Sequence, residues 1–194
     1  GNLYVLDSGN NRIVIYDKDL SFKSIITEPV IDGEVISFLN CAGMFITDSQ
    51  EIYITDPEAG LIYVVDASGI GKRSIGFVPQ PIVDSDFAYR PVRVTVDSAG
   101  IIQVQAEGCY NGLITLDSNG NMIGYCGTNK IQATAEVLVA MFWRKIFSQE
   151  QQDNIKQIIP VEFSSVAMDN EGFIYTTTKS TDTSAGDTPE IREA

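Results

Sequence analysis

The 194-residue sequence contains no histidine and is poor in basic residues, with 13 lysines and arginines against 26 aspartates and glutamates. The absence of imidazole excludes Ser-His-Asp and Cys-His nucleophile systems and every zinc site that needs histidine. The net charge of 13 − 26 = −13 repels phosphate backbones, so we expect no nucleic-acid partner. The longest apolar stretch, residues 135–143, is interrupted by Glu136 and is far shorter than the ~20 residues of a membrane-spanning helix.

Cysteine is also scarce, because the chain has only Cys41, Cys109 and Cys126. Three is an odd number and too few for a disulfide scaffold, and no pair has the CxxC spacing of a redox or metal site. We expect free thiols, with a Cys109–Cys126 disulfide as the alternative. No charged segment followed by an apolar segment opens the chain, so a secretory signal would have to stand upstream of Gly1.

What the sequence does contain is a repeat of about fifty residues. Alternating apolar and polar positions, which are typical of half-buried strands, recur at residues 2–7, 51–56 and 101–106, and again at 12–17, 61–66 and 112–117. The aspartates that close the second series, Asp17, Asp66 and Asp117, lie 49 and 51 residues apart. A third series covers residues 44–48, 92–97 and 166–169, and we align Asp48 with Asp97. Weaker fourth strands are expected near residues 22–26, 72–78 and 122–126.

The turns between these strands repeat the pattern Asp-x-x-Gly, which begins at Asp66, Asp97, Asp117 and Asp169. An aspartate in such a turn accepts backbone N–H groups, and glycine takes the positive φ that closes the hairpin. A calcium loop at Asp117 is the alternative, but its glycine stands in the wrong place for an EF-hand. Four antiparallel strands per repeat, with no crossover helix, predict the blades of a β-propeller.

The segments 2–17 and 90–100 resemble NHL repeats, whose pattern joins an Asp-x-x-Gly-Asn turn to an Asp-x-x-Asn-x-Arg loop. The resemblance is closest to bacterial extracytoplasmic NHL-repeat proteins that carry a helical insertion between blades. It implies an all-β fold, a β-propeller of NHL type with about three and a half four-stranded blades. The third repeat departs from the pattern at residues 107–111, where the Asp-x-x-Asn loop is expected, and no later strands are recognisable in the fourth repeat.

We expect residues 1–178 to form the propeller portion and residues 179–194 to form a frayed polar tail. A helical insertion is expected over residues 130–159, with apolar side chains at helical spacing over residues 134–147. It is expected to pack on the propeller surface; a lid and a hairpin that touches a membrane are the alternatives. NHL propellers usually have about six blades. The chain is therefore read as a fragment of a longer propeller or as half of a ring that a second copy completes.

Ligands of propellers meet the loops at one end of the sheets. The candidate ligand-binding residues lie in the loops between second and third strands and in the segment that joins two blades: Asp7, Asn10, Asp56, Glu107, Tyr110, Asn111, Tyr89 and Arg90. Tyr89 and Arg90 could stack on or clamp a ligand, although Arg90 could instead pair with Asp86. Asp7 and Asp56 could simply stabilise their loops. No catalytic residue and no metal ligand is assigned.

Two classes of function remain. The first is a non-catalytic binding or scaffold propeller outside the cytoplasm, extracellular or at the cell surface, with a carbohydrate, peptide or protein ligand and no cofactor. The second is a lactonase-like hydrolase of the gluconolactonase type, in which convergent carboxylates hold calcium. The missing histidine argues against amidating-lyase propellers, because these depend on histidine-bound zinc.

Overall fold

The computed structural model describes residues 1–78, 87–127, 162–169, 171–178 and 190–193. Described elements follow one another as β1 (Leu3–Asp7), the 3-10 helix η1 (Ser8–Asn10), β2 (Arg12–Tyr16), β3 (Phe22–Ile26), β4 (Val30–Ile31), β5 (Glu34–Val35), β6 (Gly43–Ile46), β7 (Ile52–Asp56), β8 (Leu61–Val65), β9 (Gly71–Ile75), β10 (Pro91–Val96), β11 (Ile102–Ala106), β12 (Leu113–Leu116), β13 (Met122–Cys126), β14 (Phe163–Met168), β15 (Ile174–Thr178) and β16 (Glu190–Glu193). The expected helical insertion over residues 130–159 lies wholly outside the described residues.

The strands form successive antiparallel sheets in chain order. The first sheet is β1-β2-β3, the second β6-β7-β8-β9, the third β10-β11-β12-β13 and the fourth β14-β15-β16. A short hairpin, β4-β5, stands between the first and second sheets. All three predicted fourth strands exist, as β3, β9 and β13. Residues 190–193 pair with β15, so the expected frayed tail is wrong for these four residues.

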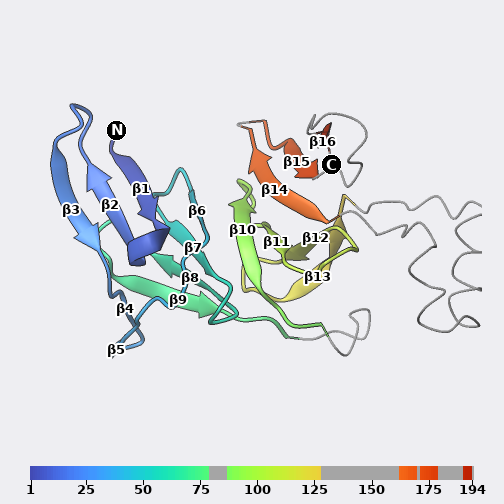
Figure 1. The fold of residues 1–194 in the computed structure, drawn as a ribbon, viewed down its shortest axis with the longest axis horizontal. Coiled ribbons are helices and arrows are strands. Elements are labelled where there is room, and N and C mark those ends of the chain that lie inside the picture. The colour runs from blue at the N-terminus through green and yellow to red at the C-terminus, as the bar shows by residue number, and fades with distance from the viewer. Residues whose placement is uncertain (79–86, 128–161, 170, 179–189, 194) are drawn as a thin grey trace, which may run out of the picture.

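The sheets lie side by side in the order of the sequence (Figure 1). We call the face of a sheet that is turned toward the preceding sheet its front and the opposite face its back. Strand β10 contacts β6 and β7 of the second sheet and β14 of the fourth. Gly43 of β6 has no side chain, and a Cβ atom there would overlap the carbonyl oxygen of Val92 in β10. The absence of a side chain therefore lets the two strands approach closely.

Apolar side chains fill the space between the first three sheets. The back of the first sheet and the front of the second share one buried cluster, which includes Ile13, Ile15, Ile52, Ile54, Tyr63 and Val65. The back of the second sheet and the front of the third share another, which includes Ile62, Val64, Ile75, Ile102, Val104 and Ile114. Burial of this apolar surface is the main stabilising contribution.

The junction between the third and fourth sheets is more polar. Among the described residues, its apolar cluster contains three buried side chains, Leu113, Phe163 and Val166. On the back of the third sheet, Thr95, Gln103 and Gln105 are at most 6% exposed. Thr115 donates a hydrogen bond to Gln103 (2.8 Å), whereas Thr95 Oγ1 and Gln105 Oε1 have no hydrogen-bond partner among the described residues.

The predicted aspartate turns are confirmed. Oδ1 of each aspartate accepts the backbone N–H groups two and four residues later, at distances of 2.8–3.0 Å, in the turns that begin at Asp66, Asp97, Asp117 and Asp169. The glycines of these turns have φ between +81° and +90°. Asp17 forms the same turn, but Leu20 takes the positive-φ position, with φ +61°.

The alignment of Asp48 with Asp97 is wrong by one residue. Thr47 N–H donates to the Glu51 carbonyl just as Asp97 N–H donates to that of Ile101. The Thr47 hydroxyl accepts the Glu51 N–H (3.1 Å), and Gln50 takes the positive φ of +63°. The turn therefore starts at Thr47, because a threonine hydroxyl can replace the aspartate carboxylate as acceptor.

The three cysteines are free thiols and differ in exposure. Cys41 is buried, and burial together with the charge of Asp56 raises the pKa of its thiol to about 12. Burial also raises the pKa of Cys109, whose Sγ donates to the Gly112 carbonyl (3.3 Å). Cys126 is half-buried.

We therefore predict that iodoacetamide at about pH 8 modifies Cys126 well before Cys41 and Cys109, because only the accessible thiolate reacts. Peptide mapping by mass spectrometry after timed alkylation measures the three rates. Alkylation in urea is the control, and there all three cysteines should react. Equal rates in the native protein would contradict the burial of Cys41 and Cys109.

Candidate ligand-binding site

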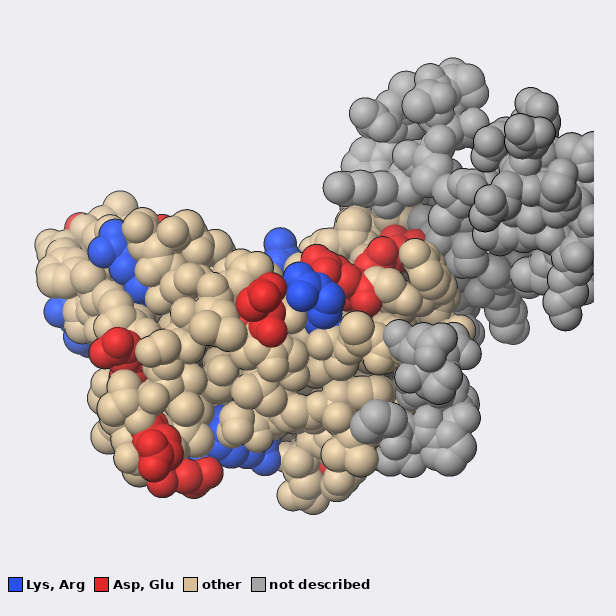
Figure 2. All heavy atoms as spheres, turned by 60° about the horizontal axis from the view of Figure 1, so that its bottom comes forward, with Lys and Arg blue, Asp and Glu red and all other residues tan. Residues whose placement is uncertain are grey.

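The candidate residues lie at one end of the sheets, the lower end in Figure 1. The loops from β1 to β2, from β7 to β8 and from β11 to β12 lie there, together with residues 87–90, which lead into β10. Figure 2 brings this end forward and shows acidic and basic side chains interspersed on the described surface. We call it the loop face.

Asp7 and Asn10 contact each other within the first loop. Asn10 Nδ2 donates to both carboxylate oxygens of Asp7 (2.9 and 3.0 Å), and Arg12 Nε donates to Oδ2 (2.7 Å). The hydrogen bonds from Arg12 and Asn10 hold the pKa of Asp7 below its usual range. The group is thus a closed network inside one loop, in which the carboxylate is already neutralised by Arg12.

Asp56 is completely buried, and its carboxylate accepts hydrogen bonds from the backbone of two segments. Its carboxylate accepts the N–H groups of Leu39 (2.7 Å) and Asn40 (3.1 Å) from the segment before β6. It also accepts those of Glu58 (3.2 Å) and Ala59 (3.0 Å) from its own loop. A buried carboxylate with four backbone donors holds the chain in place and is not accessible to a ligand.

Arg90 links the second and third sheets across the loop face. Its Nε donates to Glu107 Oε2 (2.6 Å), and Nη1 lies 3.6 Å from Glu58 Oε2. The hydrogen bond to Glu107 raises the pKa of Arg90 further above its usual value. All three side chains keep solvent access, with exposed fractions of 39% for Arg90, 52% for Glu107 and 59% for Glu58. Asp86, the partner considered from the sequence, lies outside the described residues.

Tyr89 points away from the surface. Its ring stacks on Phe77 at a centroid distance of 4.9 Å, and Phe77 meets Phe87 edge to face. The Tyr89 hydroxyl is buried without a hydrogen-bond partner in the described part of the chain, and burial raises its pKa, so it stays neutral. Tyr89 thus packs in an aromatic cluster beneath the loop face.

Tyr110 and Asn111 lie in the exposed loop from β11 to β12. The Tyr110 side chain is 45% exposed. Gly108 N–H in the same loop donates to Glu162 Oε1 (2.9 Å), which brings a third acidic side chain next to Glu107. Glu162 was missed from the sequence, because it follows the expected insertion and belongs to no repeat position.

Asn11 is a second residue that sequence reasoning missed. Its side-chain amide donates to the Leu39 carbonyl (2.9 Å), and its Oδ1 accepts the Cys41 N–H (3.0 Å). Asn11 has φ +49°, a conformation that asparagine tolerates better than most residues. Two consecutive asparagines directly before the second strand were the available signal for such a loop.

No group of three or more His, Cys, Asp or Glu side chains that could hold a metal ion is found within the described ranges. Asp117, the alternative calcium ligand, uses Oδ1 for two backbone N–H groups, and Oδ2 accepts Asn121 Nδ2 (3.0 Å). Its oxygens therefore belong to the turn.

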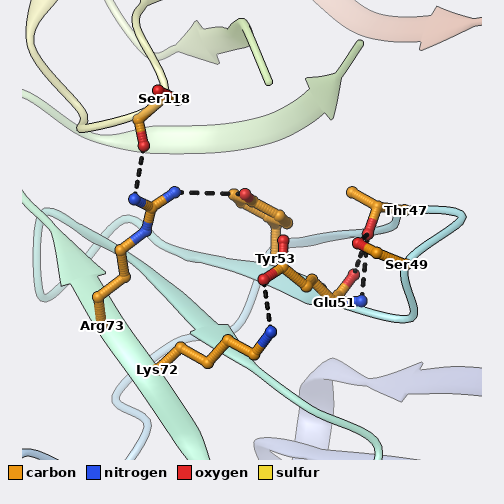
Figure 3. A network of polar contacts seen from close by, with 7 residues as sticks. All are labelled: Thr47, Ser49, Glu51, Tyr53, Lys72, Arg73 and Ser118. Atoms are coloured by element: carbon orange, nitrogen blue, oxygen red, sulfur yellow. Dashed lines mark hydrogen bonds and ion pairs between the residues drawn. The ribbon is translucent and has the colours of Figure 1, made fainter. Parts of the chain in front are cut away.

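At the opposite end of the sheets a second polar network joins neighbouring sheets (Figure 3). Arg73 of β9 donates to the Ser118 carbonyl in the turn of the third sheet, and it lies 3.4 Å from the Tyr53 hydroxyl. Lys72 pairs with Glu51 (2.6 Å) within the second sheet. The polar side chains at this end bond to one another and to the neighbouring sheet. We therefore interpret this end as a structural contact between sheets.

Compared by sequence, the chain matches no protein-family description and no curated protein. Its structure, however, matches solved propeller-fold structures. It superposes on Kuenenia stuttgartiensis hydrazine synthase with a TM-score of 0.57 and 10% identity. It superposes on virginiamycin B lyase from Staphylococcus aureus with a TM-score of 0.50 and 13% identity. The chain has a β-propeller fold.

A third match is a Bacteroides fragilis protein described as exported, with a TM-score of 0.53 and 11% identity. The three superpositions cover 99–100% of this chain but only 42%, 52% and 47% of the three other chains. At these identities the matches establish the fold alone, and the membership in the NHL-repeat family stays a prediction. In the described part of the chain, no helix is long and apolar enough to span a membrane.

Proposed function

We propose that the protein is a non-catalytic binding propeller and that the loop face around Arg90 recognises a carbohydrate, peptide or protein ligand. The observation that supports this is the half-exposed guanidinium of Arg90, held between Glu107 and Glu58 of two different sheets. The Arg90 guanidinium and the two carboxylates thus offer hydrogen-bond donors and acceptors in fixed positions, and all three side chains stay accessible to solvent. Tyr110 adds an exposed aromatic side chain on the same end of the third sheet.

The chemistry of these groups suits a polar ligand that both donates and accepts hydrogen bonds. Carboxylates of Glu58 and Glu107 accept from hydroxyl or amide groups, the guanidinium donates to oxygens, and the Tyr110 ring stacks on an apolar face. Asp7 and Asp56 contribute indirectly, because their bonds hold the surrounding loops in one conformation. Preorganised loops reduce the entropy that binding has to overcome.

The alternative function, a calcium-dependent lactonase, has less support than a binding propeller. That mechanism needs carboxylate oxygens free to coordinate the ion, whereas those of Asp56 are occupied by four backbone N–H groups. Asp7 is bound to Arg12 and Asn10. We place the protein outside the cytoplasm, in agreement with its resemblance to extracytoplasmic propellers, and the net charge of −13 disfavours a nucleic-acid partner.

The test is a screen of immobilised carbohydrates and peptides with the wild-type protein and with Arg90→Ala. We expect Arg90→Ala to weaken binding at least tenfold, because it removes the central donor of the face. Its free energy of unfolding should fall by less than about 1 kcal/mol, since the pairs are exposed. Lys18→Ala removes an exposed lysine that pairs only with its neighbour Asp19 and should bind as wild type. Wild-type protein that binds nothing on either array, or Arg90→Ala that binds unchanged, would contradict the proposal.

A further inference from the structure

The sequence contains two Asn-Gly pairs, and the structure places them in the loops at the two ends of the same strand, β12. Asn111-Gly112 precedes β12 on the loop face, and Asn119-Gly120 follows β12 in the turn that begins at Asp117. An asparagine before glycine is open to attack by the next backbone nitrogen, because glycine has no Cβ to hinder the approach. The two pairs therefore share one chemistry, and their surroundings decide which of them reacts.

The second pair is held in place. Gly120 N–H donates to the Asp117 carbonyl (2.9 Å). The N–H groups of Asn119 and Asn121 donate to Asp117 Oδ1 (2.9 and 2.8 Å). A Cβ atom at residue 120 would lie 2.6 Å from Ile75 Cγ2, so this turn also packs on the second sheet. The nitrogen that would have to attack is thus already bonded, and the turn around it has little room to move.

The first pair has none of these restraints. Asn111 is exposed, and among the described residues its side-chain amide takes part in no hydrogen bond. Gly112 lies outside the strands, and its N–H has no acceptor within the described ranges. The Gly112 carbonyl accepts a bond from Cys109 Sγ (3.3 Å), but a thiol is a weak donor. The side chain and the nitrogen that have to meet are therefore both unbonded.

We propose that Asn111 is a site of spontaneous deamidation. The Gly112 nitrogen loses its proton and attacks Cγ of Asn111, a new N–Cγ bond closes a cyclic succinimide, and the Cγ–Nδ2 bond breaks. The departing nitrogen takes up a proton and leaves as ammonia. Water then opens the ring at either of its carbonyl carbons and leaves aspartate or isoaspartate. Amide and water thus become carboxylate and ammonium, and no other reactant is needed.

The reaction changes the loop face. The product has a new negative charge in the loop from β11 to β12, which also carries Glu107 and Tyr110. In isoaspartate the backbone runs through the former side chain and gains a carbon atom, so the path of the loop changes as well. The modification depends on the local geometry of residues 111 and 112 and is independent of the proposed ligand-binding function.

Peptide mapping by mass spectrometry tests the proposal on the native protein after timed incubation at mildly alkaline pH, where more of the backbone nitrogen is deprotonated. Fragmentation by electron transfer separates aspartate from isoaspartate. We expect Asn111 to deamidate about tenfold faster than Asn119, because reaction at Asn119 first has to break the bond from Gly120 N–H. In urea this bond is lost, and the two asparagines should react at similar rates.

Two variants are compared by ion exchange, which resolves the acidic species that accumulates with time. Asn111→Gln should strongly reduce this species, because the longer glutamine side chain closes a ring much more slowly. Asn119→Gln is the matched control and should accumulate it as the wild type does. Both asparagines are exposed, so far-UV circular dichroism should stay unchanged.

Three results would overturn the proposal. The first is an Asn111 that stays intact in the native protein over the time in which it reacts in urea. The second is a native Asn119 that reacts as fast as Asn111. The third is an acidic species whose formation Asn119→Gln reduces and Asn111→Gln does not.

Discussion

Replacement of Asp56 by alanine is expected to lower the free energy of unfolding by about 3–5 kcal/mol. The substitution removes the acceptor for four backbone N–H groups at 2.7–3.2 Å and leaves a space where the carboxylate was completely buried. Buried donors without an acceptor lose their bonds to water and gain nothing in return. Urea denaturation followed by circular dichroism measures the effect as a lower transition midpoint at an unchanged slope.

Two variants separate this effect from the general cost of losing an aspartate. Asp56→Asn keeps one side-chain oxygen as an acceptor and should lose less than half as much stability as Asp56→Ala. Asp117→Ala removes an acceptor of two backbone N–H groups in an exposed turn, where water replaces the carboxylate, and should cost about 1 kcal/mol. If Asp56→Ala and Asp117→Ala lowered stability equally, the structural role assigned to Asp56 would be wrong.

Gly43→Ala is expected to lower the free energy of unfolding by about 2–3 kcal/mol. This is the opposite of the usual effect, because a strand normally becomes more stable when alanine replaces glycine. The added Cβ would overlap the Val92 carbonyl and lie 2.9 Å from Thr55 Oγ1 and 3.1 Å from Arg93 Cα. Two of these atoms belong to the backbone of β10, so the clash cannot be relieved by a side-chain rotation. The second and third sheets must move apart instead, which also strains the Thr55 hydrogen bond to Val92 (2.9 Å).

Thermal and urea unfolding of Gly43→Ala should therefore show a lower midpoint than the wild type. Gly9→Ala is the matched control, since a Cβ at residue 9 meets nothing within 4 Å, and its stability should change by less than about 0.5 kcal/mol. A Gly43→Ala protein as stable as Gly9→Ala would mean that β6 and β10 do not lie as close as described.

Much of the fold could be predicted from the sequence because its signals are local. Alternation along 51–56 or 101–106 and the Asp-x-x-Gly turns each depend on a few neighbouring residues, and the same signals recur every fifty residues. The turn at Thr47 was misplaced because a hydroxyl replaces the carboxylate there and a non-glycine residue, Gln50, takes the positive φ. Residues 190–193 form a strand without a repeat signal, through their pairing with β15.

The site was predictable only in part, because its contacts join segments that are distant in sequence. The loops that contain Asp7, Asp56 and Glu107 follow directly from the strand pattern. The partners of these residues do not: Asp56 bonds to residues 39 and 40, and Arg90 reaches Glu58 of another sheet. Whether a carboxylate faces a ligand or the backbone depends on the path of a neighbouring segment, which the repeat does not encode.

The polar junction between the third and fourth sheets has a consequence for how the chain comes apart. In a linear stack each sheet is held only by its neighbours, so the order of opening follows the strength of the individual junctions. The junction with three buried apolar residues and two buried polar atoms without a partner is the weakest in the described stack. We therefore expect the contact between the third and fourth sheets to open before the contacts among the first three described sheets.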